Sequence, residues 1–148
     1  MIVFIDGGGA KSFCSCVAVG AVAFQARCCV PYMELGRYVA ERVRRMARVG
    51  GEVKYSDVRR RADVEAVARL ISEVAEVRFK ATHFTSYGDV EGAVAELSRG
   101  AVLVVLDNQL LPKGPRVEAL VIERDSRQLP GLQLADVVAG YARSQGRR

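Results

Sequence analysis

The sequence predicts a single α/β domain built on a central mixed β-sheet with helices on both faces. Segments with strand-like patterns alternate with segments of helical periodicity along the whole chain. The first segment, residues 1–6, is almost wholly apolar, which is typical of a central strand buried on both faces. No repeat or proline-rich linker divides the chain, so we expect one domain covering residues 1–148.

Length and composition agree with this fold class. The 148 residues are 50% hydrophobic and 26% charged, which is the balance of a globular domain. A chain of this length buries roughly two thirds of its unfolded surface, so the fold needs neither metal nor disulfide for stability alone. The longest apolar stretches, residues 13–24 and 101–106, are shorter than the ~20 residues that span a bilayer. Neither follows a basic signal-peptide start, so we expect a cytoplasmic protein without membrane association.

The first half of the chain predicts strands followed by two helices. Residues 13–29 are compatible with β-structure throughout, either as a hairpin that turns near Gly20 or as one bent strand. Apolar residues recur at helical spacing over 34–48, and again over 63–75, where the first residue is an aspartate placed to cap the helix. Residues 51–61 between these helices are polar and predicted to be irregular.

The second half predicts strands that alternate with helices, and Pro130 and Gly131 interrupt the chain before the last helix. We expect antiparallel strands early in the chain and parallel strands later. The predicted elements are a strand at 76–84, a short helix at 90–97 closed by Gly100, strands at 101–106 and 117–123, and a helix at 132–144.

Carboxylates interrupt the apolar segments at specific places. Asp6 ends the first strand, Asp107 ends the strand 101–106, Asp136 interrupts the last helix, and Asp125 follows a strand directly. A carboxylate beside a core must be solvated, hydrogen-bonded, paired or bound to metal. Each acid could simply cap the end of an element, but if the acids converge, their repulsion must be cancelled by protonation or by a hard divalent cation. All-oxygen ligands suit Mg²⁺ or Mn²⁺.

Two such ions held by aspartates form the clamp used for in-line phosphodiester cleavage. The chain carries 22 basic and 17 acidic residues, and the resulting net charge of +5 favours a polyanionic partner such as DNA or RNA. The arginine run 59–61, and Arg37, Arg44 and Arg48 on the first helix, could contact phosphates or could be solvated surface.

The last helix carries a small, polar stripe. Gln133, Asp136, Gly140 and Arg143 recur at three- and four-residue spacing among apolar neighbours. Glycine inside a helix costs about 1 kcal/mol, so Gly140 predicts a close approach by a backbone, an ion or a ligand one turn beyond Asp136.

These residues resemble the C-terminal signature of the family called domain of unknown function 3800. The resemblance lies in Asp125-Ser126 followed by Leu-Gln-Leu-Ala-Asp-Val-Val-Ala-Gly at 132–140, and in Asp6, Glu52-Val53-Lys54 and the strand that ends in Asp107. It implies a ribonuclease-H-like fold, with acids gathered at one end of a central mixed sheet, and a metal-dependent nuclease activity. The set that the resemblance implies is Asp6, Asp107, Asp125 and Asp136 as Mg²⁺ or Mn²⁺ ligands, with Glu52 and Lys54 lining the site.

The chain departs from that family after its first acid. Members usually follow the first aspartate with glutamate, serine and glycine, whereas Gly7, Gly8 and Gly9 follow Asp6 here. A second acid is therefore missing, which keeps open a catalytically inactive module that binds nucleic acid or protein through a basic face.

A second resemblance competes with the nuclease interpretation. Residues 6–12, Asp-Gly-Gly-Gly-Ala-Lys-Ser, look like the first phosphate-binding turn of the sugar-kinase and actin superfamily, in which Lys11 would add positive charge. Those kinases need two lobes, which 148 residues do not provide unless two chains cooperate. The glycines could equally form an ordinary tight turn.

The remaining reactive side chains point to no separate chemistry. The spacing of the cysteines argues against a zinc site and leaves them as reduced, buried residues or as a disulfide; they are Cys14, Cys16, Cys28 and Cys29. His83 is expected to be structural. The sequence leaves the oligomeric state undetermined.

Overall fold

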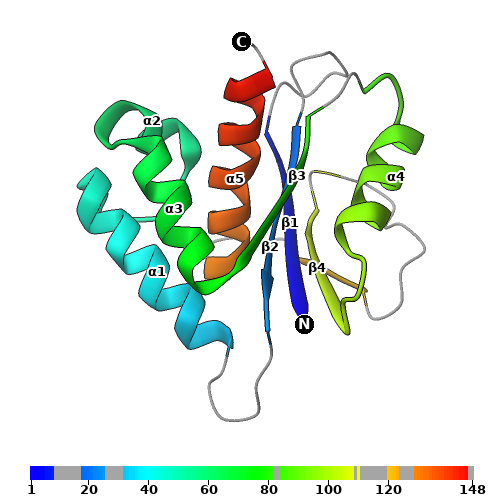
Figure 1. Ribbon diagram of the computed structural model, residues 1–148, viewed down its shortest axis with the longest axis horizontal. Coiled ribbons are helices and arrows are strands. Elements are labelled where there is room, and N and C mark those ends of the chain that lie inside the picture. Colours follow the sequence, from blue (N-terminus) through cyan, green and yellow to red (C-terminus); the bar gives the residue numbers. More distant parts are fainter. Residues whose placement is uncertain are drawn as a thin grey trace.

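The computed structural model describes residues 1–8, 18–25, 32–81, 84–108, 110, 120–123 and 129–146 (Figure 1). Five strands and five helices are found in this part of the chain. In chain order they are β1 (Ile2–Gly8), β2 (Ala18–Phe24), α1 (Tyr32–Ala47), α2 (Tyr55–Arg61), α3 (Val64–Val74), β3 (Glu76–Lys80), α4 (Tyr87–Leu97), β4 (Leu103–Asp107), β5 (Leu120–Glu123) and α5 (Pro130–Gly146).

The strands form one mixed sheet in the order β3-β2-β1-β4-β5. β1 pairs antiparallel with β2, which pairs antiparallel with β3. On the other side β1 pairs parallel with β4, and β4 pairs parallel with β5. The prediction of early antiparallel and later parallel strands is therefore confirmed.

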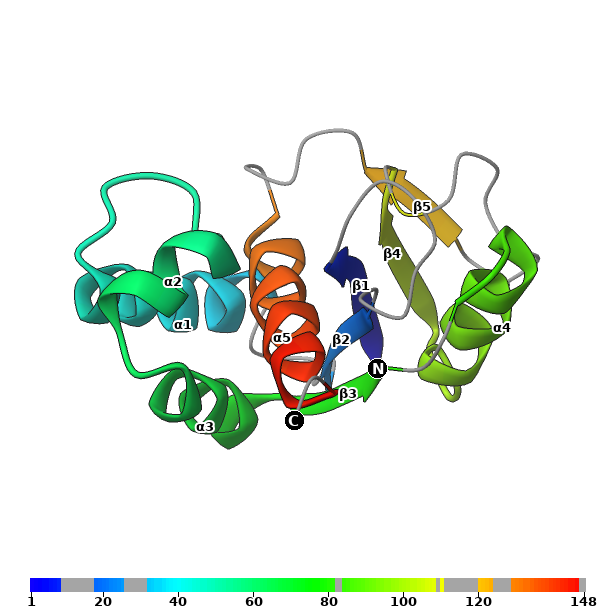
Figure 2. The same ribbon diagram turned by 90° about the horizontal axis from the view of Figure 1, so that it is seen from above.

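Helices cover both faces of the sheet, as predicted (Figures 1 and 2). α5 lies across β1 and β2, with α1, α2 and α3 beyond it on the same side, and α4 covers the opposite face. Successive side chains of β1 point to opposite faces of the sheet, so they belong to two separate hydrophobic clusters. Phe4 packs with residues of α1, α3 and α5, whereas Ile5 packs with residues of α4.

Glycines let α5 approach the sheet backbone directly. A Cβ atom on Gly20 of β2 would lie 2.3 Å from the backbone nitrogen of Ala139. A Cβ atom on Gly8 of β1 would lie 3.1 Å from the backbone of the same turn of α5. Because only glycine leaves this space, α5 sits unusually deep on β1 and β2, and nearly every described side chain of its first three turns is buried.

This packing corrects two predictions about the first strands. β1 does not form the tight turn that the glycines after Asp6 suggested but continues through Gly8, where the absence of a side chain leaves room for the backbone of α5. β2 runs without a turn through Gly20, so the hairpin alternative for residues 13–29 is wrong over its described part.

Three further elements differ from their predicted bounds. Tyr55–Arg61, predicted to be irregular, is helix α2, which sequence periodicity missed because Val58 is its one buried residue. Pro130 and Gly131 begin α5 instead of interrupting the chain, as suits a proline in a first helical turn. β3 ends at Lys80, before the predicted limit of residue 84.

Two helix boundaries were predicted correctly. Asp63 caps α3, and its side chain accepts hydrogen bonds from the backbone N–H groups of Glu65 and Ala66. Gly100 follows α4 with a φ angle of 80°, the left-handed conformation that glycine adopts readily.

None of the described helices is both long enough and apolar enough to cross a bilayer.

Candidate active site

Asp6 and Asp107 lie at the carboxyl ends of neighbouring parallel strands. Ile5 of β1 is in register with Leu106 of β4, so the aspartates that follow them are adjacent across the sheet. Each aspartate also lies two residues after a side chain on the α5 side of the sheet, Phe4 or Val105, and therefore points to that same face. The two carboxylates therefore project from the same edge of the sheet toward α5.

Asp136 reaches this edge from α5. Its side chain is half-buried, and one oxygen, Oδ2, accepts a hydrogen bond of 2.8 Å from the backbone N–H of Tyr55. This bond joins residues that lie 81 positions apart in the sequence. It satisfies one lone pair of a carboxylate that would otherwise be costly within an apolar helix.

Residues 52–55, which we call the strap, run along α5 and end at Tyr55, the first residue of α2. The backbone N–H of Val53 donates a 2.9 Å hydrogen bond to Oε1 of the buried Gln133, one helical turn before Asp136. The ring of Tyr55 covers Gly140, where an added Cβ atom would lie 2.1 Å from the ring. A close approach at Gly140 was predicted correctly, but the group that makes it is an aromatic side chain and not the backbone, ion or ligand that the sequence suggested.

The strap also carries Glu52 and Lys54, which the sequence placed in the site. Their charged groups form an ion pair with a separation of 3.7 Å between Nζ and Oε2. The side chain of Glu52 is only 18% exposed, whereas that of Lys54 is 57% exposed. Lys54 therefore places its ammonium group at the solvent side of a more buried carboxylate.

Asp6 is buried and lies close to other acids. Burial is the largest cause that raises its pKa, and together with the negative charges of Asp107, Asp136 and, more weakly, Glu52 it raises the pKa from 3.8 to about 8. A hydrogen bond of 2.7 Å from the backbone N–H of Gly7 to Oδ1 opposes it. Asp6 is consequently favoured in its protonated form at neutral pH when no cation is present.

Asp136 belongs to the same electrostatic cluster. Burial raises the pKa of Asp136, the hydrogen bond from Tyr55 and the charge of Lys54 lower it, and the charges of Glu52 and Asp107 raise it. The structure therefore brings together five of the six predicted site residues. Asp6, Glu52, Asp107 and Asp136 form one acidic cluster, and Lys54 lies beside it.

Glu123 is a further acid that the sequence analysis passed over. It is in register with Asp107 across the parallel pair β4 and β5, so its side chain leaves the sheet on the same face. The signal was available, because the strand predicted at 117–123 ends in an acid just as the strands before Asp6 and Asp107 do. Asp107 and Glu123 are both half-buried and both have interaction partners.

Several predicted residues lie outside the described part of the chain. They are Asp125 and Ser126, Lys11 of the phosphate-binding turn, His83 and the four cysteines. The role of Asp125 as a ligand and the state of the cysteines stay predictions.

The donor set fits a hard divalent cation in its chemistry. Every donor is a carboxylate oxygen, as Mg²⁺ and Mn²⁺ prefer, and four acids face one lysine. Burial raises the pKa of Asp6 most, and the charges of Asp107 and Asp136 raise it further, a repulsion that a bound cation would offset. Within the described residues, no three His, Cys, Asp or Glu side chains already stand close enough to hold one ion together.

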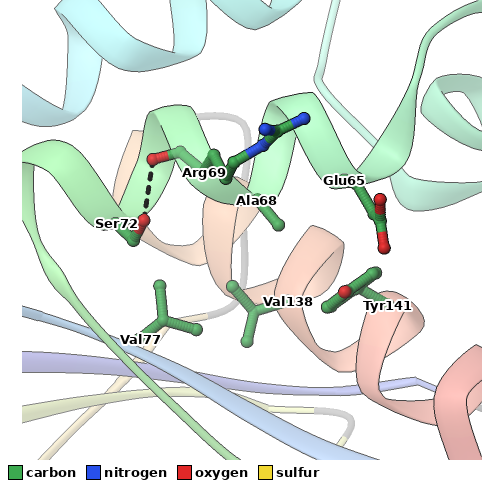
Figure 3. A pocket seen from close by; sticks show the side chains of 7 residues that line it. All are labelled: Glu65, Ala68, Arg69, Ser72, Val77, Val138 and Tyr141. Atoms are coloured by element: carbon green, nitrogen blue, oxygen red, sulfur yellow. Dashed lines mark hydrogen bonds between the residues drawn. The ribbon is translucent and has the colours of Figure 1, made fainter.

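A groove of about 360 Å³ opens on another flank of α5, between α3, β3 and α5 (Figure 3). Its floor is apolar, and no acid of the cluster lines it. The lining residues are Glu65, Ala68, Arg69, Ser72, Val77, Val138 and Tyr141. In the close-up, the hydroxyl group of Ser72 donates a hydrogen bond to the backbone carbonyl oxygen of Arg69, and the guanidinium group of Arg69 points away from Val77 and Val138.

Solved structures with the same architecture are ribonucleases H. The structure of the PCNA:RNase HII complex from Archaeoglobus fulgidus matches with a TM-score of 0.59 and 14% identity, over 98% of this chain and 72% of that chain. Ribonuclease H2 from Pyrococcus horikoshii OT3 matches with a TM-score of 0.59 and 11% identity, over 99% of this chain and 73% of that one. A mutant of Bst-RNase HIII matches with a TM-score of 0.60 and 9% identity, over 98% of this chain.

These matches establish the class of fold. The protein has an α/β ribonuclease-H-like fold, and it spans about half of the RNase HIII chain, 52%. The sequence matches no protein-family model and no curated protein. At identities of 9–14% the similarity shows architecture alone, so activity has to be argued from the site.

Proposed function

We propose that this protein is a nuclease that hydrolyses phosphodiester bonds of DNA or RNA and depends on Mg²⁺ or Mn²⁺. The observation that carries the proposal is the meeting of four carboxylates from β1, β4, α5 and the strap, with the pKa of Asp6 raised to about 8. Structural acids at the ends of elements would each be solvated or paired separately. Acids that repel one another within a shared cluster can all stay ionised when a divalent cation is bound among them.

The proposed ligands are Asp6, Asp107 and Asp136, with Asp125 added from the sequence. Cation binding then requires the carboxylates to turn toward a common ion. When bound, the ion supplies positive charge that activates water and stabilises the leaving oxygen of the phosphodiester. Membership in the domain of unknown function 3800 is part of the proposal, supported by the sequence pattern around Asp136.

The protein's own residues have distinct tasks in this proposal. The N–H of Tyr55 holds one oxygen of Asp136 and leaves the other for the ion. Lys54, exposed beside Glu52, is placed to contact a phosphate oxygen of the substrate. The net charge of +5 attracts the nucleic-acid backbone in a manner that weakens with salt.

The test is cleavage of end-labelled RNA, DNA and RNA–DNA hybrid oligonucleotides, single- and double-stranded, with Mg²⁺, with Mn²⁺ and with EDTA. The proposal expects cleavage of at least one substrate that EDTA abolishes. Asp136→Asn should remove this cleavage, whereas Asp57→Asn, which alters an acid of α2 paired with Arg60 on the surface, should retain it. Salt-sensitive binding without cleavage by any metal would favour the inactive nucleic-acid-binding module instead.

A further inference from the structure

The strap is attached to α5 at both of its ends. Val53 is bonded to Gln133 near the start of the strap, and Tyr55 closes it through its hydrogen bond to Asp136 and its ring over Gly140. Val53 is buried, Glu52 comes directly before it, and Glu52 pairs with Lys54, which lies between the two attachments. The position of Glu52 is therefore set by contacts that α5 makes with the backbone of the strap.

Gln133 is an unusual residue for its place in the core. It is 2% exposed, and its neighbours along α5, Leu132 and Leu134, are fully buried leucines. Burying an amide is unfavourable unless it is hydrogen-bonded, so a leucine would fill this position at lower cost if packing were the only demand. The specific task that the structure gives to its side-chain oxygen is to accept the N–H of Val53, the residue next to Glu52.

We propose that Gln133 is a positioning residue that sets the affinity of the cation site without touching the ion. It does so by holding the strap in the register that directs Glu52 into the acidic cluster, where Glu52 serves as the acid that the chain lacks beside Asp6. This inference rests on the proposed metal site and adds to it both a ligand from outside the sheet and the residue that places this ligand.

The geometry explains why Glu52 can take this part. Position 7 is glycine, and the space that a side chain would take there is filled by Leu110, whose Cδ1 atom would lie 2.6 Å from an added Cβ atom. Glu52 approaches instead from the strap, on the α5 side, where its negative charge acts on both Asp6 and Asp136. Outer groups that orient ligands in this way change metal affinity by about 10- to 100-fold when removed.

The experiment measures binding of Mn²⁺ alone, by the electron paramagnetic resonance signal of the free ion, to the full chain without nucleic acid. Gln133→Met keeps the length and volume of the side chain but removes the acceptor, and should weaken Mn²⁺ binding about tenfold. Glu52→Gln should weaken it similarly, and the double variant should be no weaker than either single variant, because both changes remove the same ligand. Ser98→Ala, which changes the other buried polar side chain found among the described residues, at the end of α4 on the opposite face of the sheet, should leave Mn²⁺ affinity unchanged.

A second pair of variants keeps the test decisive if Gln133→Met does not fold, as judged by melting in EDTA. Tyr55→Ala removes the ring contact over Gly140 but keeps the backbone hydrogen bond to Asp136, and should also weaken Mn²⁺ binding, whereas Tyr55→Phe, which keeps the ring, should retain most of the affinity. Unchanged Mn²⁺ affinity in Gln133→Met, or fully additive losses in the double variant, would overturn the positioning role and leave the proposed function standing. A wild-type protein that binds no Mn²⁺ would overturn both.

Discussion

Replacing Gly20 with alanine is expected to push α5 away from the sheet. The added Cβ atom would lie 2.3 Å from the backbone nitrogen of Ala139, 2.7 Å from its Cα atom and 2.9 Å from the carbonyl oxygen of Ala135. Ordinary contacts begin at 3.4 Å, so α5 must withdraw by about 1 Å. All three atoms belong to the helix backbone, and no side-chain rotation can relieve the clash.

The free energy of unfolding should fall by about 3 kcal/mol, the upper part of the usual 1–3 kcal/mol for overpacking. The lower entropy of the unfolded alanine variant offsets only about 0.4–1 kcal/mol of this loss, so destabilisation prevails. For a chain of this size the melting temperature should fall by roughly 6–12 °C. Because Gly20 pairs with Asp6 across β1 and β2, and α5 carries Asp136, Mn²⁺ binding should weaken as well.

Urea unfolding in EDTA, followed by circular dichroism, measures the fall in the free energy of unfolding. Gly92→Ala is the matched control, because Gly92 lies in the exposed part of α4 and an added Cβ atom meets nothing within 4 Å. That substitution should stabilise the protein by up to about 1 kcal/mol. A Gly20→Ala variant as stable as the wild type would refute the claim that backbone contact sets the depth of α5.

Two further predictions concern charge. In EDTA, the folded state holds a proton on Asp6 between its ordinary pKa of 3.8 and its raised pKa of about 8, so the stability that this proton confers is lost as pH rises through that window. Asp6→Asn lacks this carboxylate and should not lose stability in this way. The difference in free energy of unfolding between Asp6→Asn and wild type, measured by urea unfolding at several pH values, should therefore shift in favour of the variant by on the order of a few kcal/mol as pH rises. Arg78→Ala should cost about 2 kcal/mol, because the guanidinium group donates to the carbonyl oxygens of Leu97 and Arg99 at 2.9 and 2.8 Å and so ties β3 to the end of α4.

A specific result would contradict each of these two predictions. Parallel stability curves for Asp6→Asn and wild type across the pH range would show that Asp6 titrates normally in the folded protein. For Arg78, the control is Arg59→Ala on the exposed side of α2, expected to change stability by no more than about 0.5 kcal/mol. Equal effects of the two arginine substitutions would contradict a specific role for the bonds to α4.

Local patterns in the sequence were sufficient for most of the architecture. The apolar run before Asp6 and the apolar strand before Asp107 predicted strands because burial on both faces leaves a continuous pattern. α2 was missed because a helix with one buried residue has no apolar period to detect. The turn suggested at Gly20 was wrong because a glycine that admits a neighbouring backbone looks, in sequence, like a glycine that bends the chain.

The candidate site, like the fold, could be predicted from the sequence only in part. Asp6, Asp107 and Asp136 were recognisable because each is a charged residue at a place where the pattern calls for an apolar one. The contacts that organise them were not recognisable: Gln133 with Val53 and Asp136 with Tyr55 join residues 80 and 81 positions apart.

The sequence by itself thus determined most of the strands and helices, though not α2, and which carboxylates are out of place, since both follow from whether each side chain meets water or core. Only the tertiary structure decided that these carboxylates share one edge of the sheet, that α5 lies in backbone contact with β1 and β2, and that the strap holds Glu52 among them. Such arrangements depend on the register and depth at which distant segments pack, and a periodic pattern within one segment carries no information about its partner.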